Sequence, residues 1–358
     1  MKRIPTSELT PGMITAEDVY NYQYQLILPK GIVLNDKTIT KLAFYSIISV
    51  RVEDQSLQTE PDSDSYCLSY AERIRKSPEF IKFKKEFESD VDDFRSTIND
   101  VVQKGSPLNV EKLMNHTIDV MNLASTTPNL FDMLHSMRIY DDATYVHSMN
   151  VALICNIFAR WLRLDEDEIK KATVSGLLHD IGKLKMPEEI LKKPDKLTKQ
   201  EYSIIKRHPQ EGYRILQNST LDTDILNAVL MHHERCDGSG YPFGLSLNQI
   251  TPYAKMVAIA DVYDATTSAR VYRDALCPFK SISIFEQEGL QKYDPKYIMT
   301  FLENVVNTYL LNDVLLSNGL RGTIVYINKE KLSAPTIKTE HGFIDLYLHP
   351  DIQIEALI

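Results

Sequence analysis

Two pairs of ionisable residues stand at the ends of apolar segments, and they limit how this chain can fold. His179 and Asp180 follow the apolar run of residues 172–178, and His232 and His233 follow a second apolar segment. Burying two such groups together is costly unless they are paired or coordinate a metal. A lone buried histidine is commonly a satisfied core residue, but that explanation weakens when histidines adjoin a carboxylate and each other. The sequence therefore predicts a fold that gathers both pairs around divalent iron, manganese or zinc.

A third acidic residue belongs with them. Asp261 follows the run MVAIA at residues 256–260, which is apolar enough to be buried. An unpaired carboxylate there would be expensive, so Asp261 needs a cation. That cation is either a metal or an arginine, since Arg270 and Arg273 lie nearby in sequence.

Composition sets broader bounds. The chain has 358 residues, 43% hydrophobic and 25% charged, which is typical of a soluble globular protein. Its formal net charge of −9 argues against binding to polymeric nucleic acid. An anionic substrate would have to be captured by local cations.

Cysteine spacing and hydropathy add two exclusions. The four cysteines are far apart in sequence and form no Cys-x-x-Cys pair, which argues against a disulfide framework. The first residues lack the apolar run of a signal peptide, and no stretch approaches the ~20 apolar residues needed to span a bilayer. We therefore expect a cytoplasmic protein that does not bind membranes.

Changes in residue pattern predict four segments. Residues 1–54 form a small β-containing unit, with strands at 23–28 and 46–52 and a short helix near 38–44. Residues 55–129 hold a polar linker and amphipathic helices, with an apolar stripe formed by Phe80, Phe83, Phe87, Val91 and Phe94. Residues 130–307 are helical, and residues 308–358 form a β segment with strands at 323–327, 344–348 and 352–354.

Within the helical segment, periodicity and start signals predict a succession of helices. They cover residues 144–162, 165–178, 199–216, 222–233 and 252–269. Thr198 stands three residues before Glu201, the spacing of a capping box at a helix start. The fold is expected to be mainly α.

Five motifs in this region resemble those of one known family. They are HSMNVA from His147, HDIGK from His179, KRHP from Lys206, HHERCDGSGYPFGL from His232 and DVYDATTSARVYR from Asp261. Together they resemble the HD-GYP domain, a bacterial subfamily of the HD metal-dependent phosphohydrolases. The resemblance implies an HD-type helical bundle and hydrolysis of cyclic di-GMP, or of a related 3′,3′-cyclic dinucleotide.

The resemblance also implies a ligand set for two divalent ions, iron or manganese. Asp180 would bridge the ions, with His147, His179 and Asp261 on one and His208, His232 and His233 on the other. Some family members hold a third metal through a glutamate one helical turn before the first histidine. Here that position is Ala143, which cannot coordinate a metal, so two ions are expected.

Family resemblance further implies residues that act on the substrate. Lys183 matches the lysine that points at the scissile phosphate; without the motif, a solvated lysine capping a helix C-terminus would be the favoured interpretation. Arg270 and Arg273 match cations that hold phosphate, where planar guanidinium gives bidentate contact. Tyr241 and Pro242 lie in a glycine-rich turn that either approaches the nucleotide or is purely structural.

The leading functional hypothesis is a cyclic di-GMP phosphodiesterase that yields pGpG, with GMP left open as a further product. One alternative is a cyclic-dinucleotide sensor or scaffold without turnover. Another is an HD phosphohydrolase acting on a different cyclic dinucleotide, such as 3′,3′-cGAMP. A homodimer is left open, and protein partners are not indicated.

Overall fold

The computed structural model describes the chain except at several segments. The described residues are 2–20, 26–34, 38, 39, 42, 47–53, 74–111, 113, 114, 117, 120, 127–137, 143–193, 195–268 and 276–358. Their contacts divide the chain into two compact units. One unit comprises Met1–Tyr70, Tyr309–Asn328 and Ala334–Ile358, and the other comprises Ala71–Thr308 and Lys329–Ser333.

A long amphipathic helix, α3 (Pro78–Lys104), opens the helical unit. It begins where Ser77 accepts a hydrogen bond from the backbone of Phe80, and it ends at Gly105, whose φ of 67° suits a left-handed cap. The predicted apolar stripe is confirmed, because all five of its members are buried. Pro78 stands in the first turn of α3, where a proline is accommodated.

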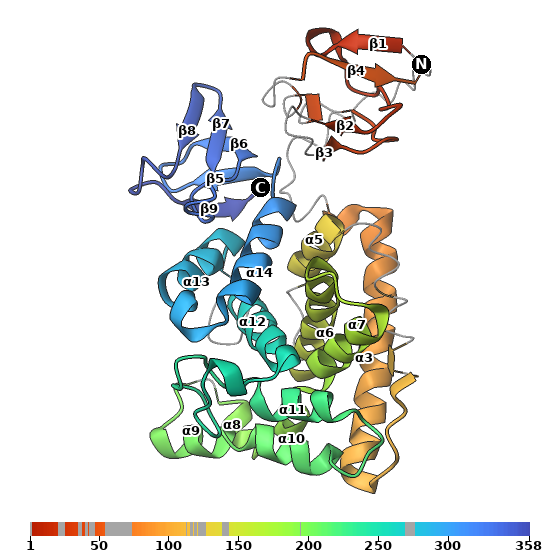
Figure 1. Ribbon diagram of the computed structural model, residues 1–358, viewed down its shortest axis with the longest axis vertical. Coiled ribbons are helices and arrows are strands. Elements are labelled where there is room, and N and C mark those ends of the chain that lie inside the picture. Colours follow the sequence, from red (N-terminus) through yellow and green to blue (C-terminus); the bar gives the residue numbers. More distant parts are fainter. Residues whose placement is uncertain are drawn as a thin grey trace. The chain divides into compact units, whose positions relative to one another are not determined.

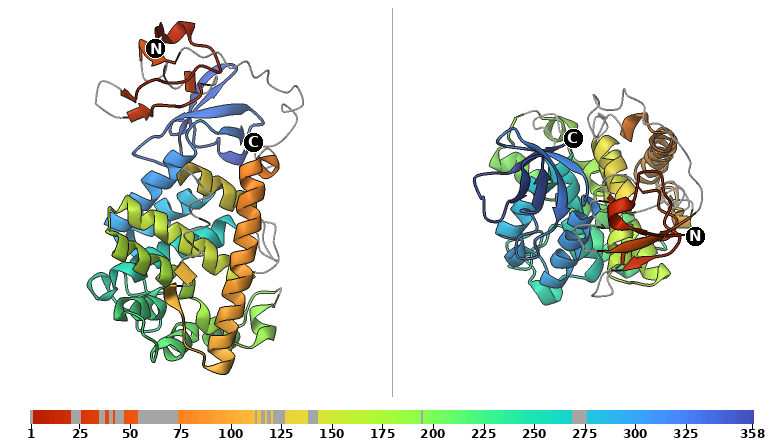
Figure 2. Two further views of the ribbon diagram at one scale, coloured as in Figure 1. Left: turned by 90° about the vertical axis from the view of Figure 1, so that its right-hand side faces the viewer. Right: turned by 90° about the horizontal axis from the view of Figure 1, so that it is seen from above.

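Three helices form the centre of this unit: α6 (Ala143–Trp161), α7 (Glu166–Leu178) and α12 (Pro252–Thr267). They pack against one another, and α3 packs against α6 and α5 (Thr127–Met137), as Figures 1 and 2 show. Helices α6 and α7 approach closely at Gly176, where an added Cβ would lie 2.9 Å from the carbonyl oxygen of Val151. The close approach explains why a glycine stands near the end of α7.

The single helix predicted over residues 199–216 is wrong. The structure has two helices there, α9 (Lys199–Ile205) and α10 (His208–Leu216). Pro209 explains the break, because a proline inside a continuous helix clashes with the carbonyl four residues earlier but is accommodated in a first turn. The predicted capping box of Thr198 and Glu201 at the start of α9 is confirmed.

Shorter elements complete the helical unit. They are the 3-10 helices Ile181–Lys185 and Leu247–Gln249 and the helices α8 (Glu188–Leu191), α11 (Thr223–Met231), α13 (Pro278–Lys292) and α14 (Pro295–Thr308). The predicted helix at 222–233 corresponds to α11, which Asp222 caps by accepting a hydrogen bond from the backbone of Asp224. The predicted mainly α fold is confirmed for the described residues.

The N-terminal β segment contains two small antiparallel pairs. Strand β1 (Lys2–Pro5) pairs with β4 (Ser49–Val52), and β2 (Val19–Tyr20) pairs with β3 (Leu26–Leu28). Buried Leu34, Leu42 and Val50 contribute to its core. Strands β3 and β4 confirm the ends of the two predicted strands. The earlier part of the first strand, much of the helix near 38–44 and the linker lie outside the described residues.

The C-terminal residues form a five-stranded antiparallel sheet in the order β8-β7-β6-β5-β9. The strands are β5 (Asp313–Leu316), β6 (Arg321–Tyr326), β7 (Thr336–Thr339), β8 (Gly342–Asp345) and β9 (Ile354–Leu357). The strand predicted at 323–327 is confirmed as β6. The one predicted at 344–348 is wrong beyond Asp345, which accepts hydrogen bonds from the backbone of Tyr347 and Leu348 in a turn. The strand predicted at 352–354 overlaps β9 only at Ile354.

Among the described residues, no helix combines the length and the apolar character that crossing a membrane requires. The four predicted segment boundaries stay predictions.

Candidate metal centre

The histidines and carboxylates of the predicted ligand set come mostly from the ends of helices. His179 caps the end of α7, Asp180 precedes the 3-10 helix, His208 begins α10 and His232 caps the end of α11. His147 lies near the start of α6, and Asp261 lies within α12. The last carbonyl groups of a helix have no hydrogen-bond partner within the helix, so they can accept hydrogen bonds from nearby side chains.

Asp180 lies between two groups of imidazoles. One group consists of His147, His179 and Asp180, and the other of Asp180, His208, His232 and His233. Within each group the available ligand atoms lie within 4.8 Å of one another. Oδ2 of Asp180 lies 3.2 Å from Nε2 of His179, and Oδ1 lies 3.2 Å from Nε2 of His208. The two oxygens of one carboxylate therefore face different groups.

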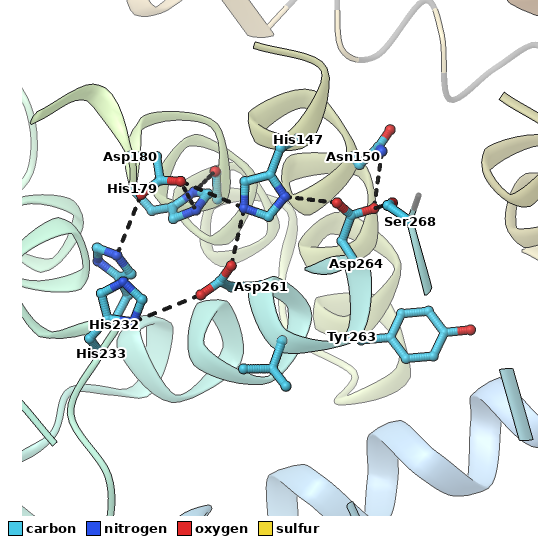
Figure 3. A network of polar contacts seen from close by, with 12 residues as sticks. His147, Asn150, His179, Asp180, His232, His233, Asp261, Tyr263, Asp264 and Ser268 are labelled. Atoms are coloured by element: carbon cyan, nitrogen blue, oxygen red, sulfur yellow. Dashed lines mark hydrogen bonds and ion pairs between the residues drawn. The ribbon is translucent and has the colours of Figure 1, made fainter. Parts of the chain in front are cut away.

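Asp261 approaches one histidine of each group. Its Oδ1 lies 3.1 Å from Nε2 of His147, and its Oδ2 lies 3.9 Å from Nδ1 of His233. Figure 3 shows its side chain pointing from α12 toward both rings. The structure thus brings together all seven of the predicted metal ligands.

Three of the imidazoles are oriented in the same way. Nδ1 of His179, His208 and His232 lies 2.7, 2.7 and 2.8 Å from the carbonyl oxygen three residues earlier, in Gly176, Ile205 and Val229. A carbonyl oxygen only accepts, so each Nδ1 carries a proton, and in the neutral ring the lone pair is on Nε2. The Nε2 atoms of His208 and His232 lie 3.1 Å apart. These Nε2 atoms are therefore available to a metal.

His147 is oriented by a side chain instead. Its Nδ1 lies 2.7 Å from Oδ2 of Asp264, one turn beyond Asp261 on α12. Asn150 and Ser268 donate hydrogen bonds of 3.0 and 3.1 Å to the other oxygen of Asp264 (Figure 3). A carboxylate behind a metal-binding histidine fixes the tautomer of the ring and raises its basicity as a ligand.

The electrostatic environment keeps most of the seven predicted ligands in the protonation state that binds a metal. Burial alone would raise the pKa of Asp180, but His179 and Lys183 hold that pKa well below its usual value. The pKa of Asp261 is lowered in the same way, against its burial, chiefly by His147. Burial and neighbouring imidazoles hold the pKa values of His232 and His233 well below the usual value, so both rings are neutral. Burial opposes the charged form of His147, yet Asp261 and Asp264 raise its pKa to about 9.

Several inward-facing atoms lack a well-aligned hydrogen bond, and this tests whether a metal fits. They are Nε2 of His147, Nε2 of His179 and Oδ1 of Asp180, all buried, although carboxylates lie nearby. Buried polar atoms without partners are costly, whereas divalent ions bound to the two groups would coordinate them. The residues present fit a divalent metal.

Comparisons with known proteins agree with this geometry. Residues 120–297 match the family model described as HD domain. Residues 120–297 therefore form an HD domain. The predicted resemblance to the HD phosphohydrolases is confirmed at the level of this domain.

Curated relatives of this HD domain protein include a cyclic di-GMP phosphodiesterase of Pseudomonas aeruginosa. It is 37% identical over 233 residues, which cover 62% of this chain and 55% of the relative. A 3′3′-cGAMP-specific phosphodiesterase of Vibrio cholerae is 38% identical over 170 residues, covering 48% of this chain and 38% of the relative. The chain thus spans about half or less of the length of these relatives.

A solved HDG"Y"P protein from Bdellovibrio bacteriovorus aligns with a TM-score of 0.47 at 16% identity. The alignment covers 85% of this chain and 99% of that chain.

A loop beside the metal centre of the HD domain carries Tyr241 and Pro242. Glu234, which is buried, accepts hydrogen bonds from the backbone of Phe243 at 2.7 Å and of Leu245 at 2.8 Å. Position 240 requires glycine because the backbone there lies close to that of Arg235: an added Cβ would lie 2.4 Å from the Arg235 nitrogen. The loop is therefore fixed to the segment that carries the paired histidines.

Tyr241 lies against the metal centre. Its ring stacks on His233 with 4.6 Å between ring centroids and 28° between planes. Burial raises the pKa of Tyr241, so its phenol stays protonated and can donate a hydrogen bond.

Of the predicted substrate-binding cations, the structure describes Lys183 but not the arginines. Nζ of Lys183 forms an ion pair with Oδ2 of Asp180. Gly182 beside it packs against α10, where a Cβ would collide with the carbonyl oxygen of His208. Arg270 and Arg273 lie outside the described residues.

Sequence reasoning missed Asp264, Asn150 and the role of Glu234. A signal for two of them is present, because Asp261 and Asp264, like His147 and Asn150, stand three residues apart and share a helix face. No comparable signal exists for Glu234, whose partners are backbone groups nine and eleven residues later.

Proposed function

We propose that this chain is a metal-dependent phosphodiesterase that hydrolyses cyclic di-GMP to pGpG, with further hydrolysis to GMP left open. The observation that carries the proposal is the position of Asp180, whose two oxygens face two separate groups of imidazoles. Two-metal sites with a shared carboxylate suit displacement at phosphorus, since paired cations stabilise attacking and leaving oxygens.

In this proposal, His147, His179 and Asp261 hold one ion, and His208, His232 and His233 hold the other. Asp180 is shared between them. When bound, the ions supply Lewis-acid polarisation of a phosphoryl oxygen and a lowered pKa for water. Iron and manganese are the proposed metals, and Ala143 at the start of α6 offers no ligand for a third.

The chain's own residues then bind and orient the substrate. Lys183 lies beside Asp180 and would direct its ammonium at the scissile phosphate, stabilising charge there or protonating the leaving oxygen. The phenol of Tyr241 and the adjacent Pro242 would contact the nucleotide. Arg270 and Arg273 are proposed to hold phosphate through bidentate hydrogen bonds.

The names of the curated relatives support a 3′,3′-cyclic dinucleotide as the substrate class. They include enzymes specific for 3′3′-cGAMP, so that nucleotide is the second candidate substrate. A sensor or scaffold without turnover is the alternative from another class. The cytoplasmic location and a homodimeric state stay predictions.

The deciding experiment is anaerobic turnover of cyclic di-GMP by protein loaded with Fe²⁺ or Mn²⁺. Wild-type protein should release pGpG or GMP in the presence of metal. Asp180→Ala should abolish turnover and lower metal content together, because the shared ligand is lost. Asp167→Asn, which changes a carboxylate 88% exposed on α7, is the matched control and should behave as wild type.

Absence of turnover with either metal, in protein that binds two ions and the nucleotide, would replace the proposal with a sensor. Turnover of 3′,3′-cGAMP alone would retain the phosphodiesterase and change its substrate.

A further inference from the structure

Lys206 lies between two tyrosine rings at the end of α9. Its Nζ is 5.2 Å from the ring centroid of Tyr202 and 5.5 Å from that of Tyr241. Tyr202 is 48% exposed, and Lys206 is half-buried. The ammonium is therefore held by aromatic rings at a position that solvent reaches in part.

The ammonium has no carboxylate partner among the residues that the structure describes. The ammonium lies over the two rings, and a cation over an aromatic face gains only about 0.5–1 kcal/mol at exposed sites. The phenolic oxygens of Tyr202 and Tyr241 likewise make no hydrogen bond within the described part of the chain. Two tyrosine rings and one cation without a carboxylate partner thus lie together in a protein whose formal net charge is −9.

These groups adjoin the proposed catalytic centre. The Tyr241 ring that contacts Lys206 stacks on His233, and the His233 ring lies 4.9 Å from that of His208. Glu234 fixes the loop that carries Tyr241, so the ring does not depend on substrate for its position. The groups are arranged to contact a ligand that extends outward from the metal centre.

We propose that Lys206, Tyr202 and Tyr241 form a second phosphate subsite, which binds the phosphodiester of a cyclic dinucleotide that is not being hydrolysed. The inference rests on the proposed phosphodiesterase function. A cyclic dinucleotide carries two phosphodiesters, and the metal ligands with Lys183 serve only one of them. An ammonium is a compact point charge with three donors, which suits a phosphate oxygen.

A phosphate subsite has a consequence for specificity. It should distinguish substrates with two phosphates from simple phosphodiesters, without distinguishing guanine from adenine. Loss of the Lys206 charge should therefore weaken the binding of cyclic di-GMP and of 3′,3′-cGAMP to the same extent.

The test compares wild type with Lys206→Gln on cyclic di-GMP and on bis(p-nitrophenyl) phosphate, which has one phosphodiester and no second phosphate. Lys206→Gln should raise KM for cyclic di-GMP roughly tenfold or more, because a charge-assisted hydrogen bond is lost, and leave kcat within about twofold. Its kcat/KM for bis(p-nitrophenyl) phosphate should match wild type. The rise of KM with salt should also be shallower in the variant.

Two further variants complete the design. Lys206→Arg should restore most of the affinity by restoring the charge. Lys199→Gln, at an exposed lysine on the same short helix, should leave both substrates unaffected.

An unchanged KM for cyclic di-GMP in Lys206→Gln would overturn the inference while leaving the phosphodiesterase intact. An equal loss on both substrates would also overturn it, because Lys206 would then act on the metal centre. A wild-type protein that cleaves bis(p-nitrophenyl) phosphate and no cyclic dinucleotide would remove the proposed function and this inference together.

Discussion

His147 differs from three of the other imidazoles of the metal centre in what orients its ring. Backbone carbonyls orient His179, His208 and His232, whereas a carboxylate, Asp264, orients His147. Asp264 is itself held by Asn150 and Ser268. The orientation of the His147 ring can therefore be altered by a substitution at Asp264 that leaves every proposed metal ligand in place.

Asp264→Asn should lower the affinity of the centre for Mn²⁺ by about 10- to 100-fold, because the ring of His147 loses its charged partner. Competition titration against a chelating indicator measures this affinity. Asp167→Asn, at an exposed carboxylate, should leave it unchanged. Wild-type affinity in Asp264→Asn would mean that the carboxylate does not position the ligand.

Lys183→Ala should separate catalysis from metal binding. The ammonium pairs with Asp180 but is not a ligand, so metal content should stay at the wild-type level while kcat falls by about 10²- to 10⁴-fold. Metal analysis and steady-state kinetics on the same preparation give both values. Loss of metal together with activity would show that Lys183 supports the ligand Asp180.

At this scale the sequence predicts the ligands well and their supports less completely. Paired histidines and Asp180 stand out because ionisable residues at the ends of apolar segments need a reason to be there. The carbonyl partners of the histidines are backbone groups, which carry no residue signature. The contact of Lys206 with Tyr202 and Tyr241 joins two segments and could not be predicted from spacing alone.

Among the elements, the loop after His233 depends on one buried side chain. Both oxygens of Glu234 accept backbone hydrogen bonds, and an isolated β-bridge between Asp237 and Ser246 closes the loop. Glutamine has only one accepting oxygen, because its side-chain NH2 group donates hydrogen bonds and cannot accept one from a backbone N–H.

Glu234→Gln should therefore leave one partly buried backbone N–H without a partner, at a cost of about 1–3 kcal/mol. We expect a higher KM for cyclic di-GMP with metal content retained, and faster limited proteolysis within residues 237–246. Glu166→Gln, at an exposed position on α7, is the control. A variant with wild-type KM and wild-type protease resistance would contradict the anchoring role.

Helix α9 offers a test by pH. Hydrogen bonds from Lys193 and from the backbone of Thr198 lower the pKa of Glu201 from 4.5 to about 2. Because the folded pKa lies below the unfolded one, this carboxylate stabilises the fold above pH 4.5, and that contribution is lost as the pH falls toward about 2.

Glu201→Gln should accordingly be less stable than wild type at pH 7, with the difference narrowing as the pH drops below 4.5. Urea denaturation followed by circular dichroism across this range measures the difference. Glu189→Gln, on the neighbouring helix, should show no such trend. A constant difference at all pH values would contradict the assigned pKa.

At the scale of elements, periodicity predicts most helices, but local chemistry decides where they stop. The stripe on α3 is confirmed, while the expected continuous helix at residues 199–216 is divided at Pro209. Strands are harder, because the C-terminal sheet uses strands of four to six residues separated by turns. So short a strand shows too few alternations to distinguish it from a loop.

For the whole molecule, metal binding should be coupled to stability. The proposed ligands come from α6, α10 and α12 and from the segments that directly follow α7 and α11, so an ion would link most of the helical core. Free Mn²⁺ at 100 times its dissociation constant should stabilise the folded state by about 2.7 kcal/mol.

This corresponds to a rise in Tm of roughly 5–10 °C for a unit of this size. Differential scanning calorimetry with Mn²⁺, and again after chelation, measures the shift. The Tm of Asp180→Ala should rise little on addition of Mn²⁺. A rise equal to that of wild type would indicate that the metal binds elsewhere.

The way the histidines are held also bears on redesign of the centre. Three imidazoles are each held by the backbone carbonyl three residues earlier, so mutating neighbouring side chains will not turn them. His147 is held by the exchangeable group Asp264, which Asn150 and Ser268 support. Directed evolution toward a different metal preference should therefore accumulate its changes at residues 150, 264 and 268, leaving the helix ends untouched.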